Sequence, residues 1–175
     1  RGRLVDAARA RYAEVARRVE TSLKTLGEVE EQMTTAIDRS LRDPRGDTPA
    51  GAIESMEIRQ HLRSLDGPER LRFLHDRASA GDRRTVSAVL TGPSYLSDLS
   101  DANHEVIRDM ASQRFAPEAF QIQQAAREAL ATVKQAGEVF ATRWDKSVGT
   151  LGVAESDRGK AVNALAAGAS RGGAA

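Results

Sequence analysis

The sequence has no cysteine, and only 4% of its 175 residues are aromatic. The absence of cysteine excludes disulfides, cysteine-ligated zinc sites and cysteine nucleophiles. With so few aromatic residues, a core has to be built mostly from Leu, Val, Ile and Ala. Runs of Val, Ile, Thr and Tyr that alternate with polar residues, which are typical of strands, are almost absent. We therefore expect an all-α protein.

The chain also lacks an excess of charge of either sign, with 26 basic and 25 acidic residues. The balance holds in each part of the chain, since residues 1–43, 44–116 and 117–175 each differ by a single charge. Nucleic-acid-binding modules usually carry a basic excess, because phosphate contacts supply much of their affinity. A nucleic-acid-associated helical protein, packed beside a genome, is therefore the alternative hypothesis and not the leading one.

No run of about 18 apolar residues is present, which excludes a membrane-spanning helix of the usual kind. The chain begins with Arg1 and not with Met. We expect from this a fragment or a processed product.

All five prolines lie between residues 44 and 117. Because proline interrupts helices, we predict four segments. Residues 1–43 form a long coiled-coil-like helix, residues 44–116 a compact subdomain of short helices, and residues 117–148 a second long helix. Residues 149–175 form a Gly/Ala-rich tail, with one short helical pattern around Val162 and Leu165, which only a partner would order.

A seven-residue apolar repeat runs through the first helix, expected over residues 3–41. One series is Val5, Tyr12, Val19, Leu26 and Met33; a second is Arg9, Ala16, Leu23, Glu30 and Ile37; a third is Ala8, Val15, Ser22, Val29 and Ala36. Steps of three and four residues mark one face of a helix. The resulting stripe is wider than the seam of a two-stranded coiled coil, and it needs a partner helix.

A second stripe lies in residues 117–148, through Ala126, Val133, Phe140 and Ser147 and through Leu130, Gly137, Trp144 and Leu151. We expect it to return antiparallel to the first. Gly27 is either a tolerated surface glycine, which is the favoured interpretation, or a point of close helix approach, and Gly137 is a second candidate for a close approach. The predicted seam residues are Val19, Leu23, Leu26, Met33, Ile37, Val133, Phe140 and Trp144.

The middle segment predicts four short helices. Thr48, Asp82 and Ser100 are N-cap candidates, and Asp66 precedes a Gly-Pro-Glu start signal. The apolar residues expected on the faces of these helices are Ile53, Met56, Leu62 and Leu65; Leu71, Phe73, Leu74 and Ala78; Val86, Val89 and Leu90; and Val106, Ile107 and Met110.

Motifs for chemistry are missing. The histidines, His61, His75 and His104, lack the spacing of a helical metal site, and no nucleophile elbow or phosphate-binding glycine loop is present. We expect no enzymatic activity, no catalytic residue, no metal and no cofactor. An enzyme is the third hypothesis, which a cleft lined by these histidines and carboxylates would support. The tripeptide Arg45-Gly46-Asp47 matches a cell-adhesion motif, and we interpret it as a chance match.

Three blocks of the middle segment, residues 57–63 (EIRQHLR), 78–82 (ASAGD) and 88–97 (AVLTGPSYLS), resemble helical proteins encoded in the structural regions of bacteriophages and prophages. The resemblance implies a virion or assembly protein from a GC-rich bacterial host, and 22 Arg against four Lys agrees with such a genome. We expect a non-enzymatic structural protein in a virion or the bacterial cytoplasm, not in a membrane. Its expected partners are copies of itself, as a homo-oligomer, or other virion proteins.

Overall fold

The structure is a computed structural model that describes residues 2–149. Over these residues the protein forms six α-helices and two short 3₁₀ helices, and no strand. The expectation of an all-α protein is therefore confirmed. The predicted Gly/Ala-rich tail lies outside the described residues, except for Gly149, and so does the helical pattern around Val162 and Leu165.

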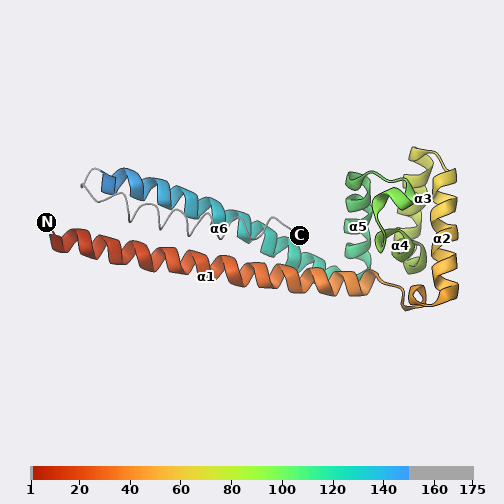
Figure 1. Cartoon of the computed structure of the whole chain (residues 1–175), viewed down its shortest axis with the longest axis horizontal. Helices are drawn as coiled ribbons and strands as arrows, with labels where there is room; N and C mark the ends of the chain where they lie inside the picture. The colour runs from red at the N-terminus through yellow and green to blue at the C-terminus, as the bar shows by residue number, and fades with distance from the viewer. Residues whose placement is uncertain (1, 150–175) are drawn as a thin grey trace. The chain divides into compact units, whose positions relative to one another are not determined.

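Two long helices span the segments in which the two stripes are predicted. α1 spans Gly2–Leu41 and α6 spans Pro117–Gly149 (Figure 1). Between them the chain forms η1 (Pro44–Asp47), α2 (Pro49–Ser64), α3 (Gly67–Ser79), α4 (Arg83–Leu90), η2 (Ser94–Ser97) and α5 (Asp101–Phe115).

Side-chain caps fix where the short helices begin. Thr48 Oγ1 accepts the Gly51 N–H at 3.1 Å, and the carboxylates of Asp66 and Asp82 and the hydroxyl of Ser100 accept the N–H three residues on. Each cap satisfies a backbone donor that the first turn of a helix leaves without a partner. These starts are strictly local, and this is why the sequence predicts them.

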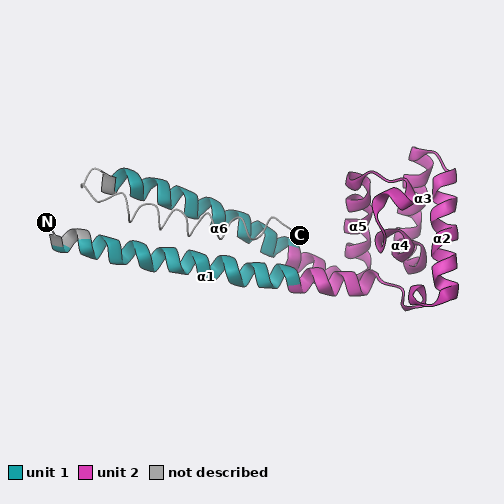
Figure 2. Ribbon diagram, viewed as in Figure 1, with its two compact units in different colours: residues 1–31, 124–175 teal, residues 32–123 magenta. Residues whose placement is uncertain are grey.

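The chain divides into two compact units (Figure 2). Unit 1 comprises residues 1–31 and 124–175, and unit 2 comprises residues 32–123. The last turns of α1 and the first turns of α6 thus belong to the same unit as the short helices.

Unit 2 encloses a continuous apolar core. Every α-helix that passes through it contributes, and the largest fully buried side chains are Ile37, Leu62, Leu74, Val86, Val89 and Ile107. All six residues of α4 from Thr85 to Leu90 are buried, so α4 is the central helix of this unit.

The charged side chain of Arg70 is also buried in unit 2, with 7% of the residue exposed. Its guanidinium donates to the carbonyls of Leu62 and Leu65, both at 2.8 Å, and to the carbonyl of Asp98. It also forms an ion pair with the Asp98 carboxylate at 2.7 Å. Arg70 therefore satisfies the carbonyls at the end of α2 and holds η2 beside them.

Three residues predicted on buried faces are instead exposed, and these predictions are wrong. Ile53 and Met56 of α2 and Val106 of α5 are each 56% exposed. In α2 the core side is taken by Leu62, with Ile58 and Leu65 packed partly against it. Ile53 lies five residues before Ile58, which is a rotation of about 140° around an α-helix.

Candidate functional site

Unit 1 is an antiparallel pair of helices, which we call the hairpin: residues 2–31 of α1 and residues 124–149 of α6. Tyr12 near the start of α1 contacts Phe140 and Trp144 near the end of α6. Glu30 near the other end of the α1 segment pairs with Arg127, early in α6. These two contacts, one towards each end of the hairpin, show that its two helices run antiparallel (Figure 1).

An aromatic cluster closes one end of the hairpin. The Tyr12 ring stacks on Phe140 with centroids 5.2 Å apart and planes 12° apart, and it lies 4.5 Å from the Trp144 ring. Both distances are typical of favourable aromatic pairs. Burial, with a further contribution from the negative charge of Asp145, raises the pKa of the Tyr12 hydroxyl above its ordinary value. Tyr12 is 8% exposed, so the neutral phenol is favoured there.

A charged pair joins the two helices at the other end. Arg127 Nε donates to Glu30 Oε1 at 2.8 Å. Glu30 occupies a position of the heptad series where an apolar residue is usual. Because both side chains keep part of their surface in water, the pair contributes little to stability and more to the alignment of the helices.

The structure brings six of the eight predicted seam residues together in the hairpin. These six are only half-buried: Val19, Leu23, Leu26, Val133, Phe140 and Trp144. The other two lie in unit 2, where Met33 is half-buried and Ile37 is 1% exposed in the core. The predicted seam is therefore divided between the two units.

The hairpin buries few side chains completely. Among its residues whose side chains the structure describes, only Tyr12, Ala126 and Gly137 are buried. A Cβ built on Gly27 would have no described atom within 4 Å, so the close-approach interpretation of Gly27 is wrong. Tyr12 and Arg127 contact the opposite helix but are not among the predicted seam residues, although Tyr12 has the largest side chain of the first heptad series.

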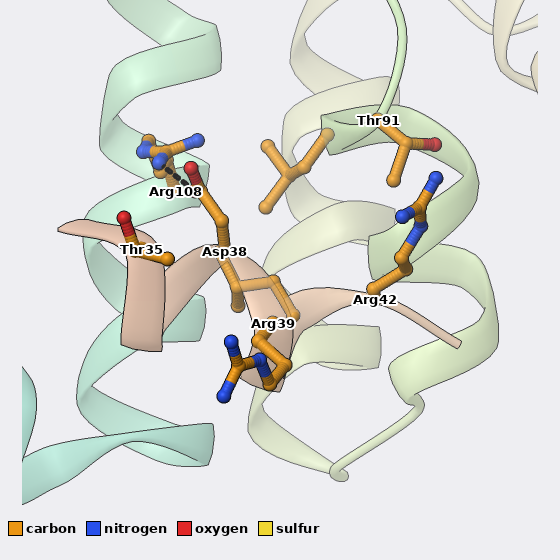
Figure 3. Close-up of a pocket in the computed structure, with 8 residues that line it drawn as sticks. Thr35, Asp38, Arg39, Arg42, Thr91 and Arg108 are labelled. Carbon is orange, nitrogen blue, oxygen red and sulfur yellow. Dashed lines mark hydrogen bonds and ion pairs between the residues drawn. The ribbon is translucent and has the colours of Figure 1, made fainter. Parts of the chain in front are cut away.

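Unit 2 contains a hollow of about 450 Å³ between the end of α1, α4 and α5. Three arginines line it, Arg39, Arg42 and Arg108, together with Asp38 and Thr91. Figure 3 shows that the Arg108 guanidinium turns to Asp38, with which it forms an ion pair, whereas Arg42 extends towards Thr91 and Arg39 points away from both. The arginines therefore do not converge on one point, as the recognition of a bound anion requires.

The Arg45-Gly46-Asp47 tripeptide forms most of η1. Arg45 pairs with Asp43 and Asp47 pairs with Arg42, each at 3.4 Å. The Asp43 carboxylate also caps η1, and the N–H of Arg45 that it accepts lowers the pKa of this carboxyl despite its burial. These interactions explain the tripeptide as part of a helix-linking turn.

The histidines do not form a common site. His61 packs edge-on against Phe73, and His75 lies 3.5 Å from Asp76 at the surface. His104 has a buried Nε2 atom that no described residue hydrogen-bonds. No cluster of His, Asp and Glu arranged to hold a metal ion occurs in the part of the chain that the structure describes. None of the described helices has the length and hydropathy that membrane crossing requires.

Comparison with known protein families, curated proteins and solved structures finds no match to this chain. Among the described residues, the apolar side chains of the hairpin are the part of the structure that remains half-buried.

Proposed function

We propose that the protein is a non-enzymatic structural or assembly protein that acts by packing its hairpin against helices of another protein molecule. The observation that carries this proposal is the contrast in burial within the stripe. Ile37, in unit 2, is fully buried, whereas Leu23 and Leu26, in the hairpin, are half-buried.

The geometry of two helices explains this contrast. A helix whose apolar stripe spans more than two heptad positions has more apolar surface than one neighbouring helix covers. In α1 the third series, which includes Val15 and Val29, widens the stripe beyond the a and d positions. Both residues are half-buried, so a coiled-coil-like or bundle partner would remove further apolar area from water. Each square ångström so removed contributes about 25 cal/mol.

A virion is the setting that we propose for this assembly. The support is the resemblance of residues 57–97 to proteins of phage structural regions, and these residues lie in unit 2. Mass spectrometry of purified particles from a phage or prophage that encodes the chain would test the setting, because a virion component is recovered with the particles in constant proportion.

The mechanism is tested by the mass of the protein in solution together with its melting temperature. We expect Leu26→Asp and Trp144→Ala to lower the stability of the assembly, since each removes an apolar contact of the hairpin. Ile53→Asp is a matched control, because Ile53 is an exposed apolar residue of unit 2 outside the hairpin. Unchanged mass and melting temperature in both hairpin variants would contradict the proposal.

A further inference from the structure

The charges of the hairpin are distributed unequally along its length. The half that contains the aromatic cluster, residues 3–20 and 134–147, carries eight basic and five acidic side chains. The half that contains the Glu30–Arg127 pair, residues 21–31 and 124–133, carries two basic and four acidic side chains. The folded hairpin thus has one half with a net positive charge and one half with a net negative charge, although each segment of the sequence is nearly balanced in charge.

One side of the hairpin carries fewer charged side chains than the other, and the charged side chains at its centre, Arg11, Arg18 and Arg143, all belong to the half with the aromatic cluster. Relative to Tyr12, the positions of Val15, Ser22 and Val29 are rotated to one side of the helix by 60–100°, at about 100° per residue. On α6 the positions of Ala129, Ala136 and Val139 are rotated in the same sense relative to Val133, by about 40–120°. Because the helices are antiparallel, both sets lie on the same side of the hairpin. We call these six residues the hairpin face.

The hairpin face leaves apolar surface in water. Val139 is 45% exposed; Val15, Val29 and Ala129 are half-buried, and Ala136 is exposed. The opposite side of the hairpin carries more charged side chains at the equivalent rotations, among them Glu20, Glu31 and Lys134, which makes it the poorer surface for a helix partner.

We infer that the hairpin face is covered by the hairpin face of a second copy, with the two copies antiparallel. This inference rests on the proposed function and names its partner. A twofold axis at the midpoint of the hairpin, near Thr21 on α1 and Ala136 on α6, places the basic half of each copy against the acidic half of the other. A parallel arrangement would instead place like charges together, which opposes association.

One pair of side chains follows from this axis. Arg143 and Glu128 lie seven and eight residues from Ala136 on opposite sides, so Glu128 of one copy reaches the level of Arg143 of the other. Both are exposed. Within the described residues neither side chain has an ion pair or a hydrogen bond of its own. The twofold symmetry produces this Glu–Arg pair twice.

Cysteine cross-linking of the full chain tests the arrangement, because the sequence has no cysteine of its own. Ser22 and Ala136 are exposed, lie close to the midpoint and belong to the hairpin face. In the antiparallel dimer Ser22→Cys cross-links to Ser22→Cys, and Ala136→Cys to Ala136→Cys, under mild oxidation or with a short bismaleimide. A mixture of the two variants then yields only these two like-with-like products. In a parallel dimer the mixture yields the product that joins Ser22→Cys to Ala136→Cys.

A charge exchange provides a second measurement that leaves the apolar face intact. We expect Glu128→Arg to weaken dimerisation about tenfold at low salt, and we expect the double variant Glu128→Arg with Arg143→Glu to restore it. The matched control is Glu20→Arg, on the opposite side of the hairpin, which leaves the dimer unchanged. Light scattering at a series of concentrations gives the dissociation constant.

The outcomes separate this inference from the proposed function. A mass of twice 18.9 kDa with like-with-like cross-links and rescue by the double variant supports both. A dimer that gives the Ser22–Ala136 cross-link overturns the antiparallel arrangement and leaves assembly through the hairpin intact. A monomer without cross-links overturns the second copy as partner, and the proposed function then requires a different protein on the hairpin.

Discussion

The two units are built from similar helices but differ in how many neighbours each helix has. In unit 2, α4 is surrounded by other elements and every residue from Thr85 to Leu90 is buried. In the hairpin each helix has one described neighbour in its unit, and Leu23 and Leu26 remain half-buried. An apolar stripe therefore shows that a helix needs partners, whereas the number of neighbouring helices decides how much of the stripe is buried.

The largest expected difference in stability is between two variants that each truncate one leucine, one leucine in each unit. We expect Leu74→Ala, at a fully buried position, to cost about 3–5 kcal/mol because it removes apolar contacts and leaves a cavity. Leu23→Ala, at a half-buried position, should cost about 1–2 kcal/mol in the monomer. Native-state hydrogen exchange reports the opening of each unit separately. Equal losses of stability at the two positions would contradict the difference in burial between unit 2 and the hairpin.

The second prediction concerns Arg70. We expect Arg70→Met to cost about 2–4 kcal/mol, because three backbone carbonyls, those of Leu62, Leu65 and Asp98, lose their donor. Arg63→Met is the matched control: Arg63 also donates to a carbonyl, that of Leu96, but its side chain is exposed. Urea unfolding followed by circular dichroism should show a loss below about 1 kcal/mol for the control. Similar losses would mean that burial of Arg70 is unimportant.

Alanine substitutions of two glycines, one in each unit, should change stability in opposite directions. A Cβ on Gly51, in unit 2, would lie 1.9 Å from the Arg45 carbonyl oxygen, so we expect Gly51→Ala to cost about 1–3 kcal/mol through a forced backbone shift. Gly27, in the hairpin, has open space at this position, so Gly27→Ala should stabilise α1 by about 0.5–1 kcal/mol. Melting temperatures of the two variants should move in opposite directions. A loss of stability in Gly27→Ala would show that its surroundings are closed.

The sequence predicts those features that depend on a few neighbouring residues. The caps at Thr48, Asp82 and Ser100 and the bounds of α1 and α6 are of this kind, because a cap bonds to a donor three residues away. The exposed positions of Ile53 and Met56 were not predictable, since the orientation of α2 depends on α4 and η2. The burial of Arg70 was not predictable either, because its acceptors come from α2 and from the left-handed residue Asp98.

The predicted seam illustrates the same limit. Heptad spacing predicts that Leu23, Leu26 and Met33 share one stripe, yet it does not show that Leu26 belongs to unit 1 and Met33 to unit 2. The division depends on which elements lie beside each turn of α1. For the same reason the charge polarity of the hairpin emerges only when the two helices are placed antiparallel.

Low pH should weaken unit 2 through Asp43. The N–H of Arg45 lowers the pKa of this carboxyl in the folded protein, so its contribution to stability is present above the ordinary aspartate pKa and is lost as pH falls through the lowered value. We expect Asp43→Asn to cost about 1 kcal/mol at neutral pH, and we expect the difference from the parent protein to shrink in acid. Chemical denaturation at a series of pH values measures it. A constant difference across the acid range would contradict the assignment.

High pH should weaken the hairpin through Tyr12, with the opposite sign. Burial and the charge of Asp145 raise the pKa of the Tyr12 hydroxyl. The folded hairpin therefore holds this proton more tightly than the unfolded chain does, and its contribution to stability is present below the ordinary tyrosine pKa and is lost as pH rises through the raised value. Tyr12 and Tyr95 are the two tyrosines of the chain, so Tyr95→Phe allows tyrosinate absorbance to report Tyr12 alone. A tyrosinate midpoint no higher for Tyr12 in the folded protein than in the unfolded chain would contradict the assignment.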